Sequence, residues 1–507
     1  MGTPLVLGAD LSTDKIEFVV VNTETGALEA GGNFKFLDHL ADRYGLKAGG
    51  FLELMDGTDA IVRVPYGLLP DALDLMLMDV RRQLGGALAN LQAICVSLQQ
   101  HGVGAYNESA DARLTELGTH PTRALSDGID GLFTTPGATS WIDSSSLPDA
   151  EELEQQRSPD FWADLTGSSP MQSLRFLLPQ VCYLHRKHRD QYESTVEFNV
   201  LASIVAGMLV GRRVGIGLDE ASCTLLMNIH RGKWATNLLR GVLPPRGLFG
   251  RLARILRPGE DLGRIWSYWV NRHNIPESCK VFLGLGDNIA ILLTLFGYGL
   301  SLGSSGTTFS EFAKATFDRT HSCHVLRSAA ERFMGMFCTN QCGKFADKVR
   351  QLIDVNWDQF HDLVANPPWD NPQAIVLPTA GVPQFLNVEP GSRVSAAAVT
   401  RSILMNMKLR SAFMGSPPSI IGTGGFAKPD VGQMIADIFR TPTYLSPEIN
   451  RVAWGSAVMA MARLQNRPLD EVAKILCPTG QRINPDPSRA EFYRQFAEAF
   501  VRTDAKF

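Results

Sequence analysis

The chain has 507 residues, which is long for one domain and comfortable for two. Its 45% hydrophobic and 20% charged residues are typical of a soluble globular protein, and a formal charge of −4 gives no indication of a nucleic-acid or membrane partner. Eight cysteines scattered over so long a chain do not form a disulfide framework, which favours a reducing, cytoplasmic setting.

Two strands joined by a tight turn are the first elements predicted along the chain. Residues 5–10 form a short apolar run, residues 12–15 are turn-forming types, and residues 16–21 are β-branched or aromatic. This pattern places Asp10, Ser12 and Thr13 at a strand end and in the turn after it. No basic region precedes the apolar run, so we expect no secretory signal.

A similar unit is predicted near the middle of the chain. A strand over residues 298–302 leads into a glycine- and serine-rich turn at 303–307, and a second strand follows over 308–312. One such unit in each half favours a duplicated plan with two related domains. Proline- and glycine-rich segments around residue 245 predict the junction there, which gives domains 1–245 and 246–507.

A strand, a glycine loop and a helix are predicted late in the chain. Residues 419–421 are strand-like, and Gly422-Thr423-Gly424-Gly425 forms the loop. A helix follows, with Asp430 as its expected N-cap, because apolar residues repeat at helical spacing over 431–439. Glycines let backbone amides approach a ligand closely. The mixture of strands and helices predicts the α/β fold class.

The common phosphate-binding sequences are absent from the chain. It has no G-x-x-x-x-G-K-[ST] motif and no protein-kinase signature set. It has instead three separate turns of small residues, at 10–13, 303–307 and 422–425. Each turn alone is more typical of an ordinary surface turn than of a nucleotide site. Only their joint order along the chain indicates a shared purpose.

Six short segments carry a family resemblance that covers nearly the whole chain. They are Gly8-Ala9-Asp10-Leu11-Ser12-Thr13, Leu98-Gln99-Gln100-His101-Gly102, Ser140-Trp141-Ile142-Asp143-Ser144-Ser145, Leu285-Gly286-Asp287-Asn288, Ser301-Leu302-Gly303-Ser304-Ser305-Gly306 and Gly422-Thr423-Gly424-Gly425-Phe426-Ala427-Lys428. In their order and spacing they resemble the motifs of the FGGY carbohydrate kinases, and within that family the xylulokinases.

The resemblance implies a fold and an activity. The fold is two actin-like, ribonuclease-H-like domains with a cleft between them, the first domain binding the sugar and the second binding ATP with Mg²⁺. The activity is transfer of phosphate from ATP to D-xylulose, giving D-xylulose 5-phosphate. Ribulose, gluconate, glycerol and sedoheptulose kinases are the alternatives within the family. A non-catalytic sugar or nucleotide sensor and an actin-like ATPase are the alternatives outside sugar phosphorylation. A dimer is typical of the family.

The resemblance also implies roles for individual residues. Asp10 is expected to hold Mg²⁺, because a hard cation prefers a carboxylate. The residues expected at the sugar are Gln100, His101, Trp141, Asp287 and Asn288. Asp287 is an alternative metal ligand, and Trp141 suits core packing equally well. The residues expected at the nucleotide are Ser12, Thr13, Gly303, Ser304, Ser305, Thr307, Gly424, Gly425 and Lys428.

The general base is expected in the segment 217–224. Glu220 stands where xylulokinases usually have the catalytic aspartate, and Gly217 stands where some relatives carry a further acid. A base must come within about 2.6–3.2 Å of the hydroxyl. The base is expected to be Glu220, whose side chain is one methylene longer than that of aspartate. If the alignment is shifted by one residue, the base is Asp219 instead, and the sequence does not decide between them. An Asp-Glu pair in a loop is also typical of solvated charge or of a helix start.

Overall fold

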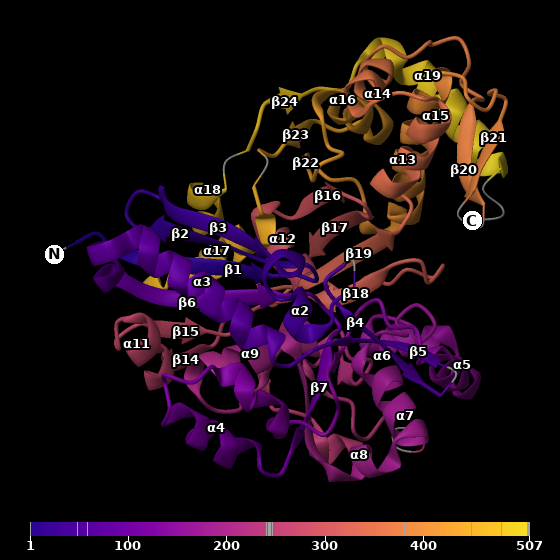
Figure 1. Cartoon of the computed structure of the whole chain (residues 1–507). Helices are drawn as coiled ribbons and strands as arrows, with labels where there is room; N and C mark the ends of the chain where they lie inside the picture. The colour runs from indigo at the N-terminus through magenta and orange to yellow at the C-terminus, as the bar shows by residue number, and fades with distance from the viewer. Residues whose placement is uncertain are drawn as a thin grey trace. The chain divides into compact units, whose positions relative to one another are not determined.

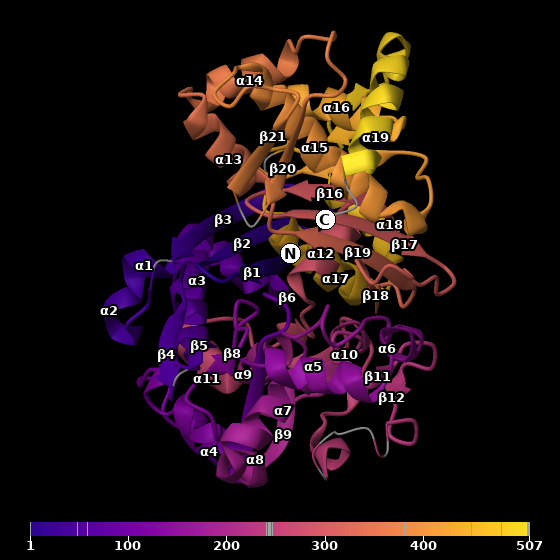
Figure 2. The ribbon, with the colours of Figure 1, turned by 90° about the vertical axis from the view of Figure 1, so that its right-hand side faces the viewer.

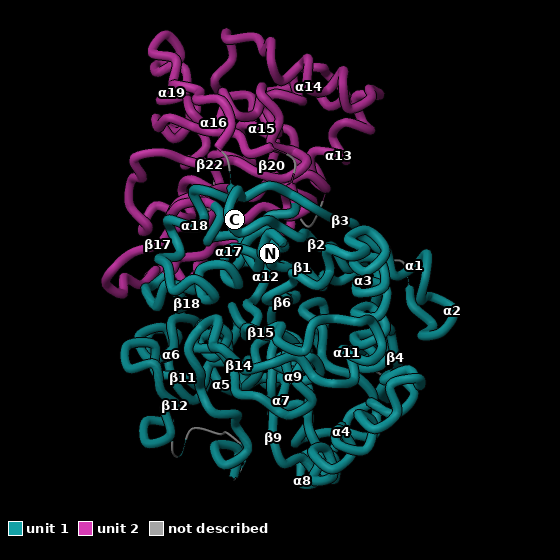
Figure 3. Tube along the Cα trace, turned by 90° about the vertical axis from the view of Figure 1, so that its left-hand side faces the viewer, with its two compact units in different colours: residues 1–294, 325–333, 450–477 teal, residues 295–324, 334–449, 478–507 magenta. Residues whose placement is uncertain are grey.

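The structure is a computed structural model that describes residues 2–47, 49–57, 59–239, 241, 245, 247–379, 382–447, 449–477 and 479–503 (Figure 1). The chain divides into two compact units (Figure 3). Unit 1 comprises residues 1–294, 325–333 and 450–477, and unit 2 comprises residues 295–324, 334–449 and 478–507. The predicted junction at residue 245 falls inside the first stretch of unit 1, and its neighbours Pro244 and Arg246 lie outside the described residues. The division into domains 1–245 and 246–507 stays a prediction.

A six-stranded sheet forms the centre of unit 1. Its order is β14 (Asp261–Arg264), β15 (Lys280–Phe282), β6 (Leu91–Leu98), β1 (Leu5–Leu11), β2 (Lys15–Asn22) and β3 (Leu28–Lys35). Strand β1 runs antiparallel to β2 and parallel to β6, while β15 runs parallel to β6 and antiparallel to β14. The hairpin predicted at the start of the chain is confirmed, because the β-branched run of β2 pairs along the whole of β1.

Helices cover both faces of this sheet. Successive side chains of β1 point alternately to one face and to the other. Leu5, Leu7, Ala9 and Leu11 belong to the apolar core shared with α3 (Leu68–Leu84) and α9 (Leu201–Val210). On the other face, Gly8 lies against α17 (Arg451–Gln465), where a methyl group at residue 8 would be 2.3 Å from the Ala453 carbonyl oxygen. The close crossing of α17 over β1 therefore depends on a residue without a side chain.

Replacing Gly8 by alanine is expected to lower the unfolding temperature clearly. The added methyl group would meet backbone atoms of α17, which cannot rotate away, and such overpacking costs about 1–3 kcal/mol. Thermal unfolding followed by circular dichroism measures the effect. Gly86→Ala is the matched control, because nothing lies within 4 Å of a methyl group there. Equal unfolding temperatures for the two variants would contradict this account of the α17 crossing.

Unit 2 repeats the strand plan of unit 1. Figure 2 labels β16, β17 and β19 of its sheet. Six of its strands follow the order β19 (Phe333–Thr339), β17 (Gly306–Phe312), β16 (Tyr298–Leu302), β22 (Ile420–Thr423), β23 (Thr443–Leu445) and β24 (Arg482–Ile483). As in unit 1, a central strand pairs antiparallel with the next strand of its hairpin and parallel with a later strand, and the last pair is antiparallel. This shared order supports the duplicated plan that the sequence predicted.

The helices of unit 2 pack with this sheet into a second apolar core. They are α13 (Gly343–Leu352), α14 (Trp357–Ala365), α15 (Val394–Arg410), α16 (Pro429–Phe439) and α19 (Ala490–Thr503). The predicted N-cap of α16 is wrong. Its N-cap is Lys428, because Pro429 favours the first helical position. Asp430 lies in the first turn, and its Oδ2 is 2.9 Å from His361 Nδ1.

Shorter elements complete both units. In unit 1 they include β4 (Leu52–Asp56), β5 (Asp59–Val64), β7 (Val103–Asn107), β8 (Ala138–Thr139), β9 (Thr195–Val200), α7 (Leu177–Lys187), α10 (Leu218–Ala221), α12 (Asp287–Thr294) and α18 (Leu469–Leu476). Unit 2 also holds the hairpin of β20 (Ile375–Thr379) and β21 (Val382–Leu386). Among the described residues, no helix is both long enough and apolar enough to cross a membrane.

Candidate functional site

Three segments predicted to carry chemistry meet at one edge of the unit 1 sheet. Because β1, β6 and β15 run parallel, their carboxyl ends lie side by side. Asp10 pairs in register with Ser97 near the end of β6. Beyond β15, Gly286 forms a parallel bridge with Leu98, and the Leu98 amide donates to the Leu285 carbonyl at 3.1 Å. The turn after Asp10, the Gln99–His101 segment and the Asp287–Asn288 pair are thus neighbours.

Asp10 is a buried carboxylate with one oxygen left over. Its Oδ2 accepts hydrogen bonds from Ser12 Oγ at 2.8 Å and from Asn450 Nδ2 at 2.9 Å. Its Oδ1 is buried and has no hydrogen-bond partner among the described residues. Burial raises the pKa of Asp10 to about 6, although Asn450, Ser12 and Lys15 lower it in part. A cation beside Oδ1 would offset the cost of burying this charge.

Asp287 and Gln100 are linked through the side-chain amide of Asn288. The Asn288 Nδ2 donates to Asp287 Oδ1 and to Gln100 Oε1, each at 3.0 Å. Burial, and then the nearby charge of Asp10, raise the pKa of Asp287 to about 7, while backbone N–H groups lower it in part. Both Asp287 and Asn288 stay partly exposed. These side chains offer donors and acceptors of the kinds that sugar hydroxyls need.

The two acids of helix α10 are buried far more deeply. Asp219 is 0% and Glu220 is 2% exposed. Glu220 Oε1 accepts a hydrogen bond from Gln100 Nε2 at 3.0 Å, and its pKa is raised to about 8 by burial and by the charge of Asp219. Burial also raises the pKa of Asp219, to about 7. A methyl group at residue 217 would lie 2.3 Å from Asp219 Oδ1, so this carboxylate fills the space that Gly217 leaves.

Asp219→Asn is expected to stabilise the chain at alkaline pH relative to the wild type. The pKa of Asp219 rises from 3.8 to about 7 on folding, so between about pH 4 and pH 7 the native state binds a proton that the unfolded chain has released. Native stability therefore falls as the pH rises through this window and stays lower above it. Because asparagine carries no charge, the variant should unfold roughly 2–4 °C higher than the wild type at pH 8.

Thermal unfolding of both proteins at pH 5 and pH 8 measures this effect. The advantage of Asp219→Asn should be smaller at pH 5 than at pH 8, because near pH 5 the buried carboxyl of the wild type is mostly protonated. An advantage that does not grow with pH would contradict the buried, shifted carboxyl.

His101, Trp141 and Thr13 lie around the same edge of the sheet. The His101 backbone has a φ of 70°, and its ring stacks on Phe176 with centroids 4.5 Å apart. Trp141 is 37% exposed, so it is not a core residue, and its Nε1 donates to Thr13 Oγ1 at 2.9 Å. The Thr13 hydroxyl in turn donates to Gln99 Oε1 at 3.1 Å. The turn after β1 is thereby tied to the end of β6.

The remaining predicted nucleotide residues lie together in unit 2. The turn 303–305 joins β16 to β17, and the loop 424–425 follows β22, which pairs parallel with β16. Gly424 has a φ of 99°, and a methyl group there would be 2.4 Å from the Leu302 carbonyl oxygen. Ser304, Ser305, Gly424 and Gly425 are exposed, whereas Thr307 is buried, with Oγ1 3.5 Å from Cys338 Sγ. Lys428 is partly exposed at the start of α16.

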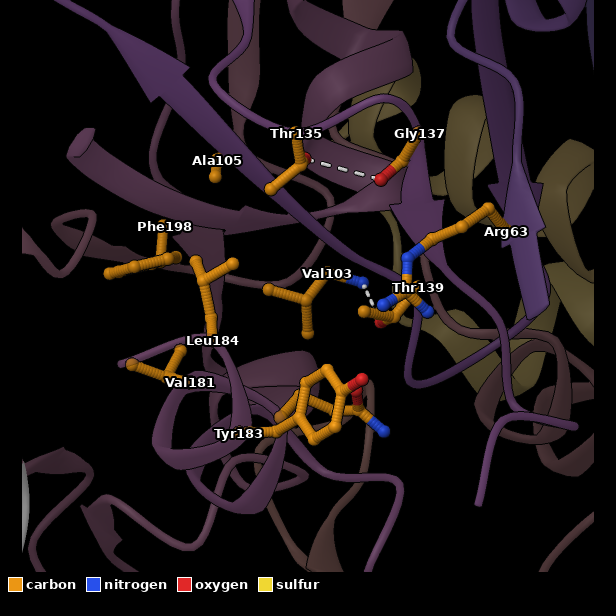
Figure 4. Close-up of a pocket in the computed structure, with 11 residues that line it drawn as sticks. Arg63, Val103, Ala105, Thr135, Gly137, Thr139, Val181, Tyr183, Leu184 and Phe198 are labelled. Atoms are coloured by element: carbon orange, nitrogen blue, oxygen red, sulfur yellow. Dashed lines mark hydrogen bonds between the residues drawn. The ribbon is translucent and has the colours of Figure 1, made fainter. Parts of the chain in front are cut away.

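A cavity of about 30 Å³ lies elsewhere in unit 1 (Figure 4). Its lining is mostly apolar, with Val103, Val181, Leu184 and Phe198, and it also contacts Arg63. A volume of this size suits a water molecule or two, whereas small-molecule pockets measure about 300–1,000 Å³. This cavity is therefore too small for a sugar.

Three features of the unit 1 sheet edge and of the unit 2 loops were not predicted from the sequence. Asn450 caps α17 through hydrogen bonds from the amides of Val452 and Ala453, and also contacts Asp10. An asparagine before a helical run is an N-cap signal that the sequence shows. Its contact with Asp10, 440 residues away, leaves no signal in the sequence. Gly286 gives room to Glu220 and Gln100. In unit 2, α13 begins beside the Gly303 turn, with the Gly343 amide donating to the Gly303 carbonyl at 2.9 Å.

Comparison with curated sequences finds several relatives that share one name. The chain is 27% identical over 401 residues to a probable D-xylulose kinase A of Aspergillus flavus, a match that covers 77% of this chain and 68% of that protein. It is 28% identical over 389 residues to the protein of the same name in Aspergillus niger, covering 73% and 66% of the two chains. No protein-family model matches the chain.

Comparison with solved structures finds the same overall fold. A gluconate kinase and a ligand-bound xylulose kinase, both from Lactobacillus acidophilus, each match with a TM-score of 0.82 and 17% identity. They cover 99% of this chain and 98% and 99% of their own. A glycerol kinase from Plasmodium falciparum with ADP matches with a TM-score of 0.79 and 13% identity, covering 100% and 99% of the two chains. The predicted α/β fold class is confirmed, and the fold is that of sugar kinases.

Proposed function

We propose that this chain is a sugar kinase that transfers the γ-phosphoryl group of ATP to D-xylulose, giving D-xylulose 5-phosphate. The observation that carries the proposal is the convergence of Asp10, Asp287, Gln100 and Asn288 at one edge of the unit 1 sheet. The names of the Aspergillus relatives support the choice of sugar. The fold of the solved sugar kinases supports the reaction class.

The acceptor hydroxyl needs a carboxylate that it can reach, and Asp287 suits this role best. Asp287 is partly exposed, whereas Asp219 and Glu220 are almost completely buried. A pKa of about 7 is also close to the value that general base catalysis favours near neutral pH. Asp287 would take the proton as the hydroxyl oxygen attacks the γ-phosphorus and ADP leaves. His101 and Asn288 would orient the sugar through their polar atoms. Gln100 is 2% exposed and already hydrogen-bonded to Glu220 and Asn288, so we assign it to holding Asn288 in place.

Asp10 fits the role of magnesium ligand. Its buried Oδ1 has no partner among the described residues, and a carboxylate oxygen is the ligand type that Mg²⁺ prefers. Mg²⁺ usually keeps several waters and binds substrate phosphates, so one or two protein carboxylates can hold it. When bound, Mg²⁺ would neutralise charge on the phosphates during transfer. Ser12 and Asn450 hold the Asp10 carboxylate in place through its other oxygen.

The nucleotide would bind the two neighbouring loops of unit 2. Ser304 and Ser305 are exposed donors, and the backbone of Gly424 and Gly425 carries no side chain that would block an adenosine. The start of α13 beside the same turn adds the positive end of a helix dipole, which favours phosphate. Ser12 and Thr13 are already hydrogen-bonded to Asp10 and Gln99, so we assign them to positioning the turn.

A coupled assay of ADP release tests the proposal. Purified protein with ATP and Mg²⁺ is offered D-xylulose, D-ribulose, gluconate, glycerol and sedoheptulose in separate reactions, with a reaction without sugar as the control. We expect the highest kcat/KM with D-xylulose and little turnover without sugar. Preference for another acceptor would change the substrate but keep the reaction. Equal ATP turnover with and without every acceptor would overturn the sugar-kinase assignment.

A further inference from the structure

An uninterrupted chain of hydrogen bonds joins the buried acid of α10 to Asp287. Glu220 Oε1 accepts from Gln100 Nε2 at 3.0 Å, and Gln100 Oε1 accepts from Asn288 Nδ2 at 3.0 Å. The same Asn288 Nδ2 donates to Asp287 Oδ1 at 3.0 Å. We call these four side chains the amide relay, in the order Glu220, Gln100, Asn288 and Asp287. Each of its links joins one donor to one acceptor.

The relay has one consistent direction. Because the Asn288 amide nitrogen can only donate, it must face the oxygen of Gln100. The nitrogen of Gln100 must then point the other way, toward an acceptor. Glu220 supplies a strong acceptor, and the Cys223 Sγ at 3.3 Å from Gln100 Nε2 supplies only a weak one. If the Glu220 oxygen is removed, the side-chain amide of Gln100 loses the partner that fixes its orientation. In the flipped orientation, the Gln100 nitrogen would face the Asn288 nitrogen, and two donors would meet.

The backbone before Asp287 is shaped around the same acid. A methyl group at residue 286 would lie 2.2 Å from Glu220 Oε1 and 2.3 Å from Gln100 Cγ. Glu220 and Gln100 therefore pack directly against the residue that precedes Asp287. This contact is independent of the hydrogen bonds and gives Glu220 a second route to the position of Asp287.

Resting on the proposed function, we propose that Glu220 is a positioning residue, which fixes Asp287 for proton transfer through the amide relay and never contacts the sugar. Its near-complete burial agrees with this role, since an acid that takes a proton from a sugar must be reachable. Its value to the reaction lies in its accepting oxygen and not in its charge. A glutamine at this position should therefore serve nearly as well as the native residue.

The test compares Glu220→Met, which removes the acceptor at similar length, with Glu220→Gln, which keeps an acceptor oxygen. Steady-state kinetics with D-xylulose should show kcat lowered about 10–100-fold in Glu220→Met, because small misplacements of reacting groups have effects of this size. In Glu220→Gln, kcat should stay within about threefold of the wild type. Glu197→Met and Glu197→Gln are the matched controls, because Glu197 is partly buried and, like Glu220, accepts from a side-chain amide, Asn199 Nδ2 at 3.1 Å.

The outcomes separate three readings of Glu220. A general base predicts a collapse of kcat in Glu220→Gln, which would overturn the positioning role. A purely structural residue predicts a lower unfolding temperature with unchanged kcat in Glu220→Met, as we expect for Glu197→Met, and this too would overturn it. If Glu220→Met does not fold, Glu220→Gln alone still decides between positioning residue and base. A wild-type chain that phosphorylates no acceptor overturns the proposed function and this inference with it.

Discussion

Asp287→Asn is expected to lower kcat for sugar phosphorylation by about 10²–10⁴-fold, the usual contribution of a general base. Asparagine keeps the size of the side chain and an oxygen for the Asn288 amide, so the amide relay survives while the proton acceptor is lost. The KM for sugar should change much less than kcat. Steady-state kinetics with saturating ATP and Mg²⁺ measures both constants.

The pH profile gives a second check on Asp287. Since its pKa is raised to about 7, the wild-type kcat/KM should rise as the pH increases from 5 to 8 and level off above the pKa. The residual activity of Asp287→Asn should lack this rise. Glu220→Gln and Asp219→Asn, assayed beside it, decide among the three acids. A large kcat loss in either of them, with Asp287→Asn active, would contradict the assignment of Asp287.

The sequence predicts those parts of the site that depend on local patterns. The sequence predicts Asp10 at a strand end because turn residues stand between two runs of strand-forming residues, and such a hairpin needs no distant partner. Local residue types predict the glycine loop at 422–425 in the same way. Local patterns also gave the repeated hairpin of unit 2. In each of these segments, the residues that determine the structure are neighbours in the chain.

Contacts between distant segments account for what the sequence did not predict. Asn450 reaches Asp10 only because α17 crosses β1, and that crossing depends on Gly8 and on residues more than 440 positions away. The sequence predicts both Glu220 and Asp287 as acids of the site. Glu220 is buried and Asp287 is partly exposed because of how distant segments pack around them, which local patterns do not predict. The sequence therefore identified which acids matter more readily than what each acid does.

Asp10→Asn is expected to lower kcat/KM by roughly 10²–10³-fold and to raise the Mg²⁺ concentration needed for half-maximal rate, because a neutral amide holds a hard cation less well than a carboxylate. The hydrogen bonds from Ser12 and Asn450 can persist, since asparagine retains an accepting oxygen. Asp14→Asn, an exposed change of the same charge in the adjacent turn, is the control. Rates measured over a Mg²⁺ titration separate the two variants. An Asp10→Asn variant with the Mg²⁺ dependence of the wild type would show that the orphaned Asp10 oxygen has another purpose, because a lost ligand must weaken the binding of its ion.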